Sequence, residues 1–369
     1  MKRLIGISAL AAATVAASVA AAPASPRAAG GGVTVFAGPN LAAPPPGVSK
    51  QADVLAFFPS SVTVHVGDTV TWQFRGFHTV TFPGTKKPYP FIAPVGGKEP
   101  VTKDAAGKQF WWGGKVPLLG VSPLSLAPQG PPALGSASQI ASSGLVRILT
   151  APANKPPAPF ELRFTKAGTY HYQCAVHPGM RGIVRVLPAS APVTSPAAAA
   201  SQGKAQLQRT IGAVKQLAHT KPSAPLTVDV GAGNGPTGGE ITAFFPATLH
   251  VKVGQTVHFV NHDPTDIHTV TFGPEAYRSK IEKTFAAPHG KQVLLNPLGG
   301  FSSDPPSSTP LRYGGTNHGN GYVNSGVLQP KGSPKAAGPQ SFALTFTKPG
   351  TYKYECVIHT NMDGTIVVS

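Results

Sequence analysis

The clearest pattern along the chain is a strict alternation of apolar and polar residues, the period of a β-strand with one buried face. Residues 62–66 read Val-Thr-Val-His-Val, residues 67–68 are a Gly-Asp turn, and residues 69–72 resume the alternation as Thr-Val-Thr-Trp. Gly168 and Gly350 each precede a segment of the form Thr-Tyr-x-Tyr-x-Cys. Alternating β-branched and aromatic residues with turns between them are typical of sheets. The pattern predicts an all-β fold built from sandwiches.

The pattern occurs twice, in the same order. Three segments of the first half match three of the second: residues 57–72 with 244–259, residues 78–82 with 268–272, and residues 164–174 with 346–356. The middle pair is identical, as His-Thr-Val-Thr-Phe. A repeat of this length indicates a duplicated sandwich rather than a short solenoid unit. We therefore expect two tandem β-sandwiches, at residues 30–188 and 225–369.

The N-terminal segment has the layout of a cleaved signal peptide. Lys2 and Arg3 precede an apolar run from Leu4 to about Val19, and three alanines follow it. The run is short and rich in Ala for a membrane anchor, although an uncleaved anchor is the alternative. We expect residues 1–25 to be removed. The mature chain would then be extracytoplasmic (secreted, in a periplasm or at the cell surface) without a transmembrane span.

Between the two sandwiches we expect a linker at residues 189–224 that contains a short helix. The linker begins rich in Ala, Pro and Ser, and residues 201–219 then show the spacing of a helix. Its apolar face would consist of Leu207, Ile211, Val214 and Leu217.

Each sandwich also carries a long insert rich in Gly and Pro, at residues 84–159 and 273–339. Because structureless loops of this length are uncommon in compact domains, we expect added strands inside the inserts. We expect Trp111 and Trp112, in the first insert, to pack in a core.

Composition bears on the partners. The chain has 31 Lys and Arg against 14 Asp and Glu, a formal net charge of +17, and such a charge favours anionic partners. Acidic redox proteins and anionic cell-surface material are the candidates. The basic residues are scattered and no nucleic-acid motif is present, so we do not expect nucleic acid binding.

The two cysteines lie in matching motifs. Residues 174–180 read Cys-Ala-Val-His-Pro-Gly-Met and residues 356–362 read Cys-Val-Ile-His-Thr-Asn-Met, both with Cys-x2-His-x2-Met spacing. The chain has 2 Cys and 3 Met, and apart from Met1 all of them fall in this motif. With one upstream His, each half supplies a thiolate, two imidazoles and a thioether. Such a set is the blue-copper arrangement, in which the Met is a weak axial ligand.

Two other interpretations of these residues are weaker. An exported protein with two cysteines ordinarily forms a disulfide. Pairing Cys174 with Cys356 would require two equivalent loops to meet face to face, and it would leave the repeated His and Met without a role. Zinc also binds Cys and His, but it gains little from an axial thioether. We therefore expect two type 1 copper sites, each cycling between Cu(I) and Cu(II).

Each half resembles the small blue copper proteins of the plastocyanin, pseudoazurin and amicyanin group, the cupredoxins. The resemblance rests on three pieces in order: Phe-x-Pro with Val-x-Val-Gly-x-Thr-Val, then His-x-Val-x-Phe, then Gly-Thr-Tyr-x-Tyr-x-Cys-x2-His-x2-Met. It covers the two ends of each half, not the inserts. It implies two tandem cupredoxin-like Greek-key sandwiches whose copper ligands are His78, Cys174, His177 and Met180 in the first and His268, Cys356, His359 and Met362 in the second.

The sequence departs from this group in two ways. The inserts lengthen the distance from the first His to the Cys, so they could cover the copper or reshape the docking face. Thr79 and Thr269 follow the first His, where many relatives have an Asn that tethers the ligand loop. In the resembling group the His of the loop is exposed and electrons pass through it, which implies exposed edges for His177 and His359 here.

The leading hypothesis for function is an exported electron carrier rather than an enzyme. The alternatives are extracytoplasmic copper capture or delivery and, less favoured, a multicopper oxidoreductase. Oxidases of that kind carry His-x-His motifs around the Cys, and none is present. A catalytic copper bound by His alone needs three convergent ligands. The closest spare pair is His258 and His262, with Asp263 and Asp266 nearby; His250 and His258 are expected to face solvent.

Overall fold

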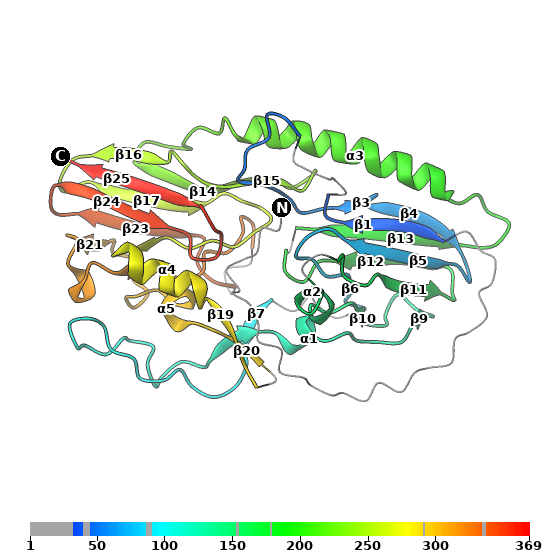
Figure 1. Ribbon diagram of the computed structural model, residues 1–369, viewed down its shortest axis with the longest axis horizontal. Helices are drawn as coiled ribbons and strands as arrows, with labels where there is room; N and C mark the ends of the chain where they lie inside the picture. The colour runs from blue at the N-terminus through cyan, green and yellow to red at the C-terminus, as the bar shows by residue number, and fades with distance from the viewer. Residues whose placement is uncertain are drawn as a thin grey trace.

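The computed structural model describes residues 32–39, 45–85, 91–152, 155–177, 179–290, 292–333 and 337–369 (Figure 1). The expected signal peptide at residues 1–25 lies outside the described residues. None of the helices within these ranges is both long enough and apolar enough to cross a membrane.

The first half of the chain forms two five-stranded sheets. The first has the strand order β3-β1-β5-β11-β9, with β1 at Val33–Ala37, β3 at Phe57–Phe58, β5 at Thr69–Phe74, β9 at Ala133–Leu134 and β11 at Phe160–Phe164. The second has the order β10-β6-β12-β13-β4, with β4 at Ser61–His65, β6 at Thr81–Phe82, β10 at Ala141–Ser142, β12 at Gly168–Gln173 and β13 at Arg181–Leu187.

The second half repeats this arrangement with one strand added. Its first sheet has the order β2-β15-β14-β17-β23-β21, with β2 at Ala52–Val54, β14 at Thr227–Asn234, β15 at Gly239–Phe245, β17 at Thr256–Asn261, β21 at Leu311–Tyr313 and β23 at Ser341–Phe346. Its second sheet has the order β16-β25-β24-β18-β22, with β16 at Thr248–Val251, β18 at Thr271–Phe272, β22 at Val323–Asn324, β24 at Gly350–Glu355 and β25 at Asp363–Val368.

The strand directions repeat as well as the order. β1 pairs with β5 and β14 with β17 in parallel, and β13 with β4 and β25 with β16 do the same. Along β4 and β5 the apolar residues are buried and the polar ones are partly exposed, as the alternation predicted. Burial of one face of each sheet supplies the hydrophobic stabilisation of a sandwich. The prediction of an all-β fold with two tandem sandwiches is confirmed.

A long helix, α3 at Pro196–Leu217, lies along both sandwiches (Figure 1). It packs on β1 and β3 of the first half and on β14 and β15 of the second. The side chain of Ser195 caps it by accepting a hydrogen bond from the Ala198 N–H at 3.1 Å. The helix therefore begins five residues earlier than predicted. The alanines that suggested a linker are strong helix formers, and Ala199, within the helix, is buried.

One strand of the first half joins the second. β2 pairs antiparallel with β15, so that Asp53 lies opposite Glu240. Leu55, the residue after β2, donates its backbone N–H to the Gly238 carbonyl at 2.6 Å. The two sandwiches thus share an edge as well as the helix above it.

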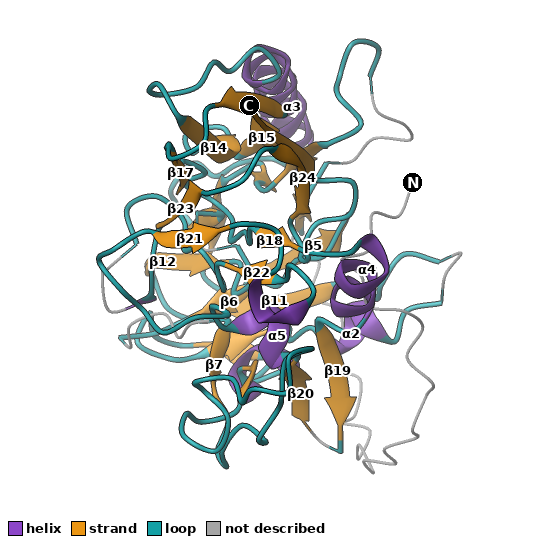
Figure 2. Ribbon diagram, turned by 90° about the vertical axis from the view of Figure 1, so that its left-hand side faces the viewer, coloured by secondary structure: helices purple, strands orange, loops and turns teal. Residues whose placement is uncertain are grey.

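The inserts contain the added strands that we predicted. β7 at Ile92–Pro94, β8 at Leu119–Val121, β19 at Ala286–His289 and β20 at Gln292–Leu295 form one four-stranded sheet from both inserts, in the order β19-β20-β8-β7. This sheet lies at the side of the molecule opposite α3 (Figure 2). The helices of the inserts are α1 at Pro123–Leu126, α2 at Val146–Leu149, α4 at Glu275–Lys283, α5 at Pro297–Gly300 and η1 at Asn317–Gly319.

The tryptophans of the first insert hold it against the second. Trp112 is buried, as predicted, with its ring stacked on Phe110 and 6.1 Å from the ring of Phe301. Trp111 donates from Nε1 to the Ser302 carbonyl at 2.9 Å. Aromatic packing and this bond join the two inserts in one core.

Candidate metal centres

The first centre is organised by one short loop between two paired strands. Cys174 directly follows β12 and Met180 directly precedes β13. The loop is closed by two backbone bonds, from Cys174 N–H to the Met180 carbonyl at 2.9 Å and from Met180 N–H to the His177 carbonyl at 2.9 Å. Three of the predicted ligands therefore have their relative positions set by local geometry.

The fourth predicted ligand comes from elsewhere in the sandwich. His78 lies between β5 and β6, and its Nδ1 is 3.1 Å from the Nδ1 of His177. The Cys174 Sγ lies 3.5 Å from the same His177 nitrogen. All three side chains are buried.

The second centre repeats this geometry closely. The Nδ1 atoms of His268 and His359 are 3.1 Å apart, and the Cys356 Sγ lies 3.6 Å from the Nδ1 of His359. Cys356 N–H donates to the Met362 carbonyl at 3.0 Å. In each centre the two nitrogens and the sulfur lie within 4.8 Å of one another.

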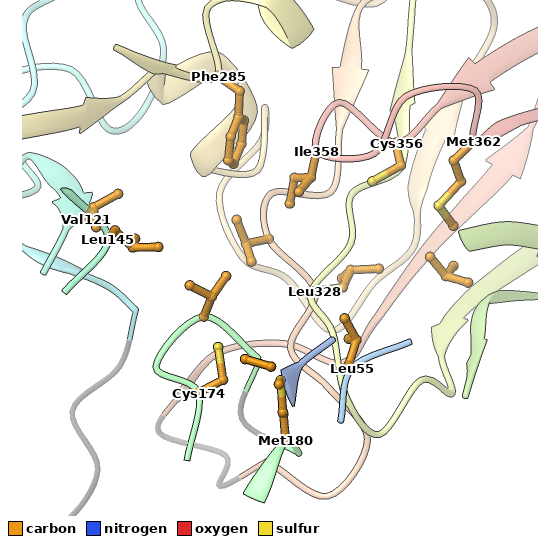
Figure 3. Close-up of a cluster of buried hydrophobic side chains, with 14 of the residues drawn as sticks. Leu55, Val121, Leu145, Cys174, Met180, Phe285, Leu328, Cys356, Ile358 and Met362 are labelled. Carbon is orange, nitrogen blue, oxygen red and sulfur yellow. The ribbon is translucent and has the colours of Figure 1, made fainter. Parts of the chain in front are cut away.

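The methionines are buried beside these groups. Met180 and Met362 are almost fully buried, and Figure 3 shows each of them near the Cys of its own loop, with Ile358 among the apolar side chains between the loops. In such a buried cluster a single proton can be shared by only one pair among the two nitrogens and the sulfur. A metal cation coordinated by the lone pairs of all three atoms would satisfy them together. The combination of soft sulfur and imidazole ligands fits copper. Within the described ranges, these two groups are the ones that could hold a metal ion.

A threonine ties each ligand loop to the segment that carries the first His. The Thr79 Oγ1 accepts a hydrogen bond from the Ala175 N–H at 2.7 Å, and the Thr79 N–H donates to the Cys174 Sγ at 3.3 Å. Thr269 makes the same contacts with Val357, at 2.9 Å, and with Cys356, at 3.3 Å. Thr thus makes a tether of the kind for which many relatives of the resembling group use Asn.

The imidazoles determine the charge state of the sulfurs. Burial alone would raise the pKa of the Cys174 thiol, but His177 and then His78 outweigh it and hold that pKa well below its ordinary value. His268 and His359 do the same to the pKa of Cys356. Against the lowering effect of burial, the Cys174 thiolate raises the pKa of His177 to about 9. Each centre therefore favours the thiolate, which is the form that binds metals.

Two carboxylates stand behind the imidazoles, on the side away from the sulfurs. The Asp266 Oδ2 lies 3.1 Å from the Nε2 of His359 and 4.0 Å from the Nε2 of His177. The Asp263 Oδ2 lies 3.6 Å from the Nε2 of His268. Sequence reasoning did not assign these contacts. The available signal was two acids just before His268 in a chain that has few of them.

The spare histidines do not form the cluster considered from sequence. His258 is exposed on β17, and His250 is exposed on β16, both as predicted. His262 instead faces Asp229, with its Nε2 3.5 Å from the Asp229 Oδ1. Asp263 and Asp266 turn to the predicted copper ligands rather than to this pair.

The expectation of an exposed edge is wrong for His177, and His359 is only partly exposed. His177 is 5% exposed, and the side chain of His359 is 13% exposed. Both line a cavity of about 40 Å³ whose other walls come largely from the two inserts, including Val121, Leu145 and Phe285. The inserts therefore cover the ligand loops, which the length of the inserts had suggested as one outcome.

No protein-family model matches the chain, and neither does any curated protein. Among solved structures the chain is similar to a Cu(I) form of an amicyanin variant, at 21% identity over 42% of this chain and 89% of that chain, with a TM-score of 0.22. It is similar to an oxidized amicyanin variant at 24% identity over 33% and 70%, with a TM-score of 0.18. It is also similar to amicyanin from Paracoccus versutus at 18% identity over 42% and 88%, with a TM-score of 0.22.

Proposed function

We propose that this chain is an exported copper-binding electron-transfer protein with one type 1 site in each half. The observation that supports it best is the repeated convergence of two Nδ1 atoms and one thiol sulfur, buried beside a methionine, at the same end of two like sandwiches. Bound there, copper would supply a one-electron couple between Cu(I) and Cu(II). His78, Cys174, His177 and Met180 would hold the first ion, and His268, Cys356, His359 and Met362 would hold the second.

The residues around each centre suit this role because they keep it rigid and dry. The ligand loop is closed by backbone bonds, tethered by a threonine and covered by apolar side chains. A donor set that moves little between oxidation states lowers the barrier to electron exchange. Rigidity of the loop and exclusion of water both serve that end.

Export and domain organisation belong to the same proposal. Residues 1–25 would act as a signal peptide, residues 30–188 and 225–369 as cupredoxin domains, and residues 189–224 as the connection between them. The high positive charge favours an acidic redox partner or anionic surface material. Because the two loop histidines are covered, such a partner would dock on another face of the molecule.

Copper capture or delivery is the second candidate, and one observation weighs against delivery. Seven of the eight predicted ligands are buried, His359 is partly buried, and residues of both inserts line the cavity beside the two ligand loops. Metal release to an acceptor therefore requires part of that cover to open. Copper transfer to a chelator much slower than reduction by an acidic redox protein would favour the electron carrier.

Metal analysis with an optical spectrum of the purified chain tests the proposal. The parent should bind two copper ions and show the intense visible band of a thiolate bound to Cu(II). Cys174→Ser and Cys356→Ser should each lose one ion and part of the band, and the double variant should lose the band entirely.

Matched controls are Ser122→Ala and Ser303→Ala, which change buried residues outside the metal centres. Both should keep two ions and the full band. A double cysteine variant with the parent spectrum would refute the copper assignment.

A further inference from the structure

The two centres are not independent ends of the molecule, because their loops meet across one short segment. Residues 262–267 of the second half lie between them. A Cβ added at Gly179, in the ligand loop of the first half, would lie 2.7 Å from the Thr265 Cγ2 and 3.2 Å from the Pro264 carbonyl oxygen. The first ligand loop therefore packs directly on a loop of the second half.

This segment has no equivalent in the first half. Strand β17 ends at Asn261, seven positions before His268, whereas β5 ends at Phe74, four positions before His78. The longer connection carries Asp263 and Asp266, and the shorter one carries no acidic residue. The two halves thus differ in sequence and length in the segment that lies between the two centres.

Asp266 is held firmly in this segment. Its side chain is buried, and its Oδ1 accepts a hydrogen bond from the Ile267 N–H at 2.7 Å. Its backbone carbonyl accepts a hydrogen bond from the Asn261 Nδ2 at 3.1 Å. With one oxygen occupied, Oδ2 is left facing the His359 Nε2 at 3.1 Å and the His177 Nε2 at 4.0 Å.

The nitrogens that face Asp266 are the ones that the ligand set does not use. In both histidines Nδ1 points to the sulfur of its own centre and Nε2 points away from it. A carboxylate at the far nitrogen fixes the tautomer and orientation of a ligating imidazole and raises its basicity. Since one oxygen faces both imidazoles, the same negative charge acts on a ligand of each centre.

We propose that Asp266 is a positioning residue shared by the two metal centres, which it joins through His177 and His359. The inference rests on the proposed function, because it assigns these histidines as ligands. It also predicts that Asp266 affects the second centre more strongly than the first, because its contact with His359 is shorter than its contact with His177. Asp263 accepts hydrogen bonds from Thr265 at Oδ1, and its Oδ2 faces His268 and no other predicted ligand, so it positions the second centre only.

Metal affinity tests the proposal with each centre isolated. Cys356→Ser leaves the first centre and Cys174→Ser leaves the second, and each is titrated with Cu(II) against a competing chelator, alone and with Asp266→Asn. We expect Asp266→Asn to weaken the second centre about 10- to 100-fold and the first by a smaller factor. The visible band should shift in both.

Asp263→Asn is the matched control, because it removes a buried carboxylate from the same segment. It should weaken the second centre and leave the affinity and spectrum of the first unchanged. An effect of Asp266→Asn confined to the second centre would overturn the proposal. If neither single-centre chain binds copper before Asp266 is changed, it is the proposed function that fails.

A metal-free measurement tests the shared contact without copper. Asp266→Asn should move the imidazole nitrogen chemical shifts of both His177 and His359, whereas Asp263→Asn should move those of His268 and leave His177 unchanged. Unchanged His177 shifts in a folded Asp266→Asn chain would refute the link, whatever the copper titration shows.

Discussion

The Oδ2 of Asp104 and the Nδ1 of His318 lie 3.0 Å apart, although 214 residues separate them in the chain. The other nitrogen of the same imidazole, Nε2, lies 3.1 Å from the Oδ2 of Asp304. Asp104 belongs to the first insert, and His318 and Asp304 belong to the second. The imidazole is therefore clamped between two carboxylates, and the clamp joins the inserts that cover both metal centres.

This clamp predicts a pH dependence of stability. Burial alone would lower the pKa of His318, but its bonds to Asp304 and Asp104 outweigh burial and raise that pKa above its ordinary value. A histidine with a raised folded pKa contributes stability below its unfolded pKa, near 6.5, and the contribution is lost as pH rises through the folded pKa. In urea unfolding of the metal-free chain, His318→Gln should have a lower free energy of unfolding than the parent. The difference should be largest near pH about 6 and should shrink progressively at higher pH.

His250→Gln serves as the control, because His250 is exposed on β16. The free energy of unfolding of this variant should depend on pH in the same way as that of the parent. A stability difference between the parent and His318→Gln that stays constant with pH would contradict the clamp.

Two glycines make room for the first histidine of each centre. Gly38 and Gly231 have φ of 88° and 72°. A Cβ on Gly231 would lie 2.4 Å from the His268 Nε2, and one on Gly38 would lie 2.8 Å from the His78 Nε2 and 2.3 Å from the Arg75 carbonyl oxygen. Gly231→Ala should displace His268 and abolish metal binding by the second centre only, and Gly38→Ala should do so for the first. Metal counting and the optical band measure both outcomes.

Gly254→Ala is the control that separates the clash between an added Cβ and the histidine ring from the strain of a positive φ. Gly254 has a similar φ of 88°, but nothing lies within 4 Å of a Cβ added there. The variant should lose about 1–2 kcal/mol of stability and keep both metal ions. Equal metal loss in Gly254→Ala and Gly231→Ala would count against the steric explanation.

The threonine tethers should tune each centre separately. Thr79→Ala removes the acceptor of the Ala175 N–H and leaves that buried donor unpaired, which costs about 1–3 kcal/mol. We expect the band of the first centre to shift and its loop to loosen, with the second centre unaffected. Thr269→Ala should show the reverse, as measured on chains that carry one centre each.

Thr79→Ser retains the hydroxyl and is the matched control. It should return the spectrum and most of the stability to parent values. A spectrum in Thr79→Ser that matches Thr79→Ala would mean that the methyl group, not the hydrogen bond, is what matters.

The aromatic contact between the inserts should be important for stability. Trp112 is buried, and its ring stacks on Phe301 of the second insert at 6.1 Å between ring centroids. Trp112→Ala should lose about 3–5 kcal/mol in chemical unfolding, because it opens a cavity where the inserts meet. Val101→Ala, at a side chain that is 60% exposed, should change stability by less than about 0.5 kcal/mol. Similar losses from both variants would contradict a joint core.

The fold class could be read from the sequence because strand alternation and turns are local properties. Val62, Val64 and Trp72 alternate with polar residues, and this spacing alone places them on a buried face. The start of α3 was missed for the opposite reason. Its first turns contain small residues with no apolar stripe, and their burial comes from packing across both sandwiches.

Some features of the candidate centres could likewise be predicted from the sequence, and others could not. Cys174, His177 and Met180 could be singled out together because one loop of seven residues carries them, and its spacing repeats in the second half. The sequence by itself determined the repeated sandwiches and the soft donor sets. Only the tertiary structure decided that the loop histidines are covered and that Asp266 faces both. Those features depend on how the two halves and their inserts pack together, and contacts between residues so distant in the chain leave no periodic signal along it.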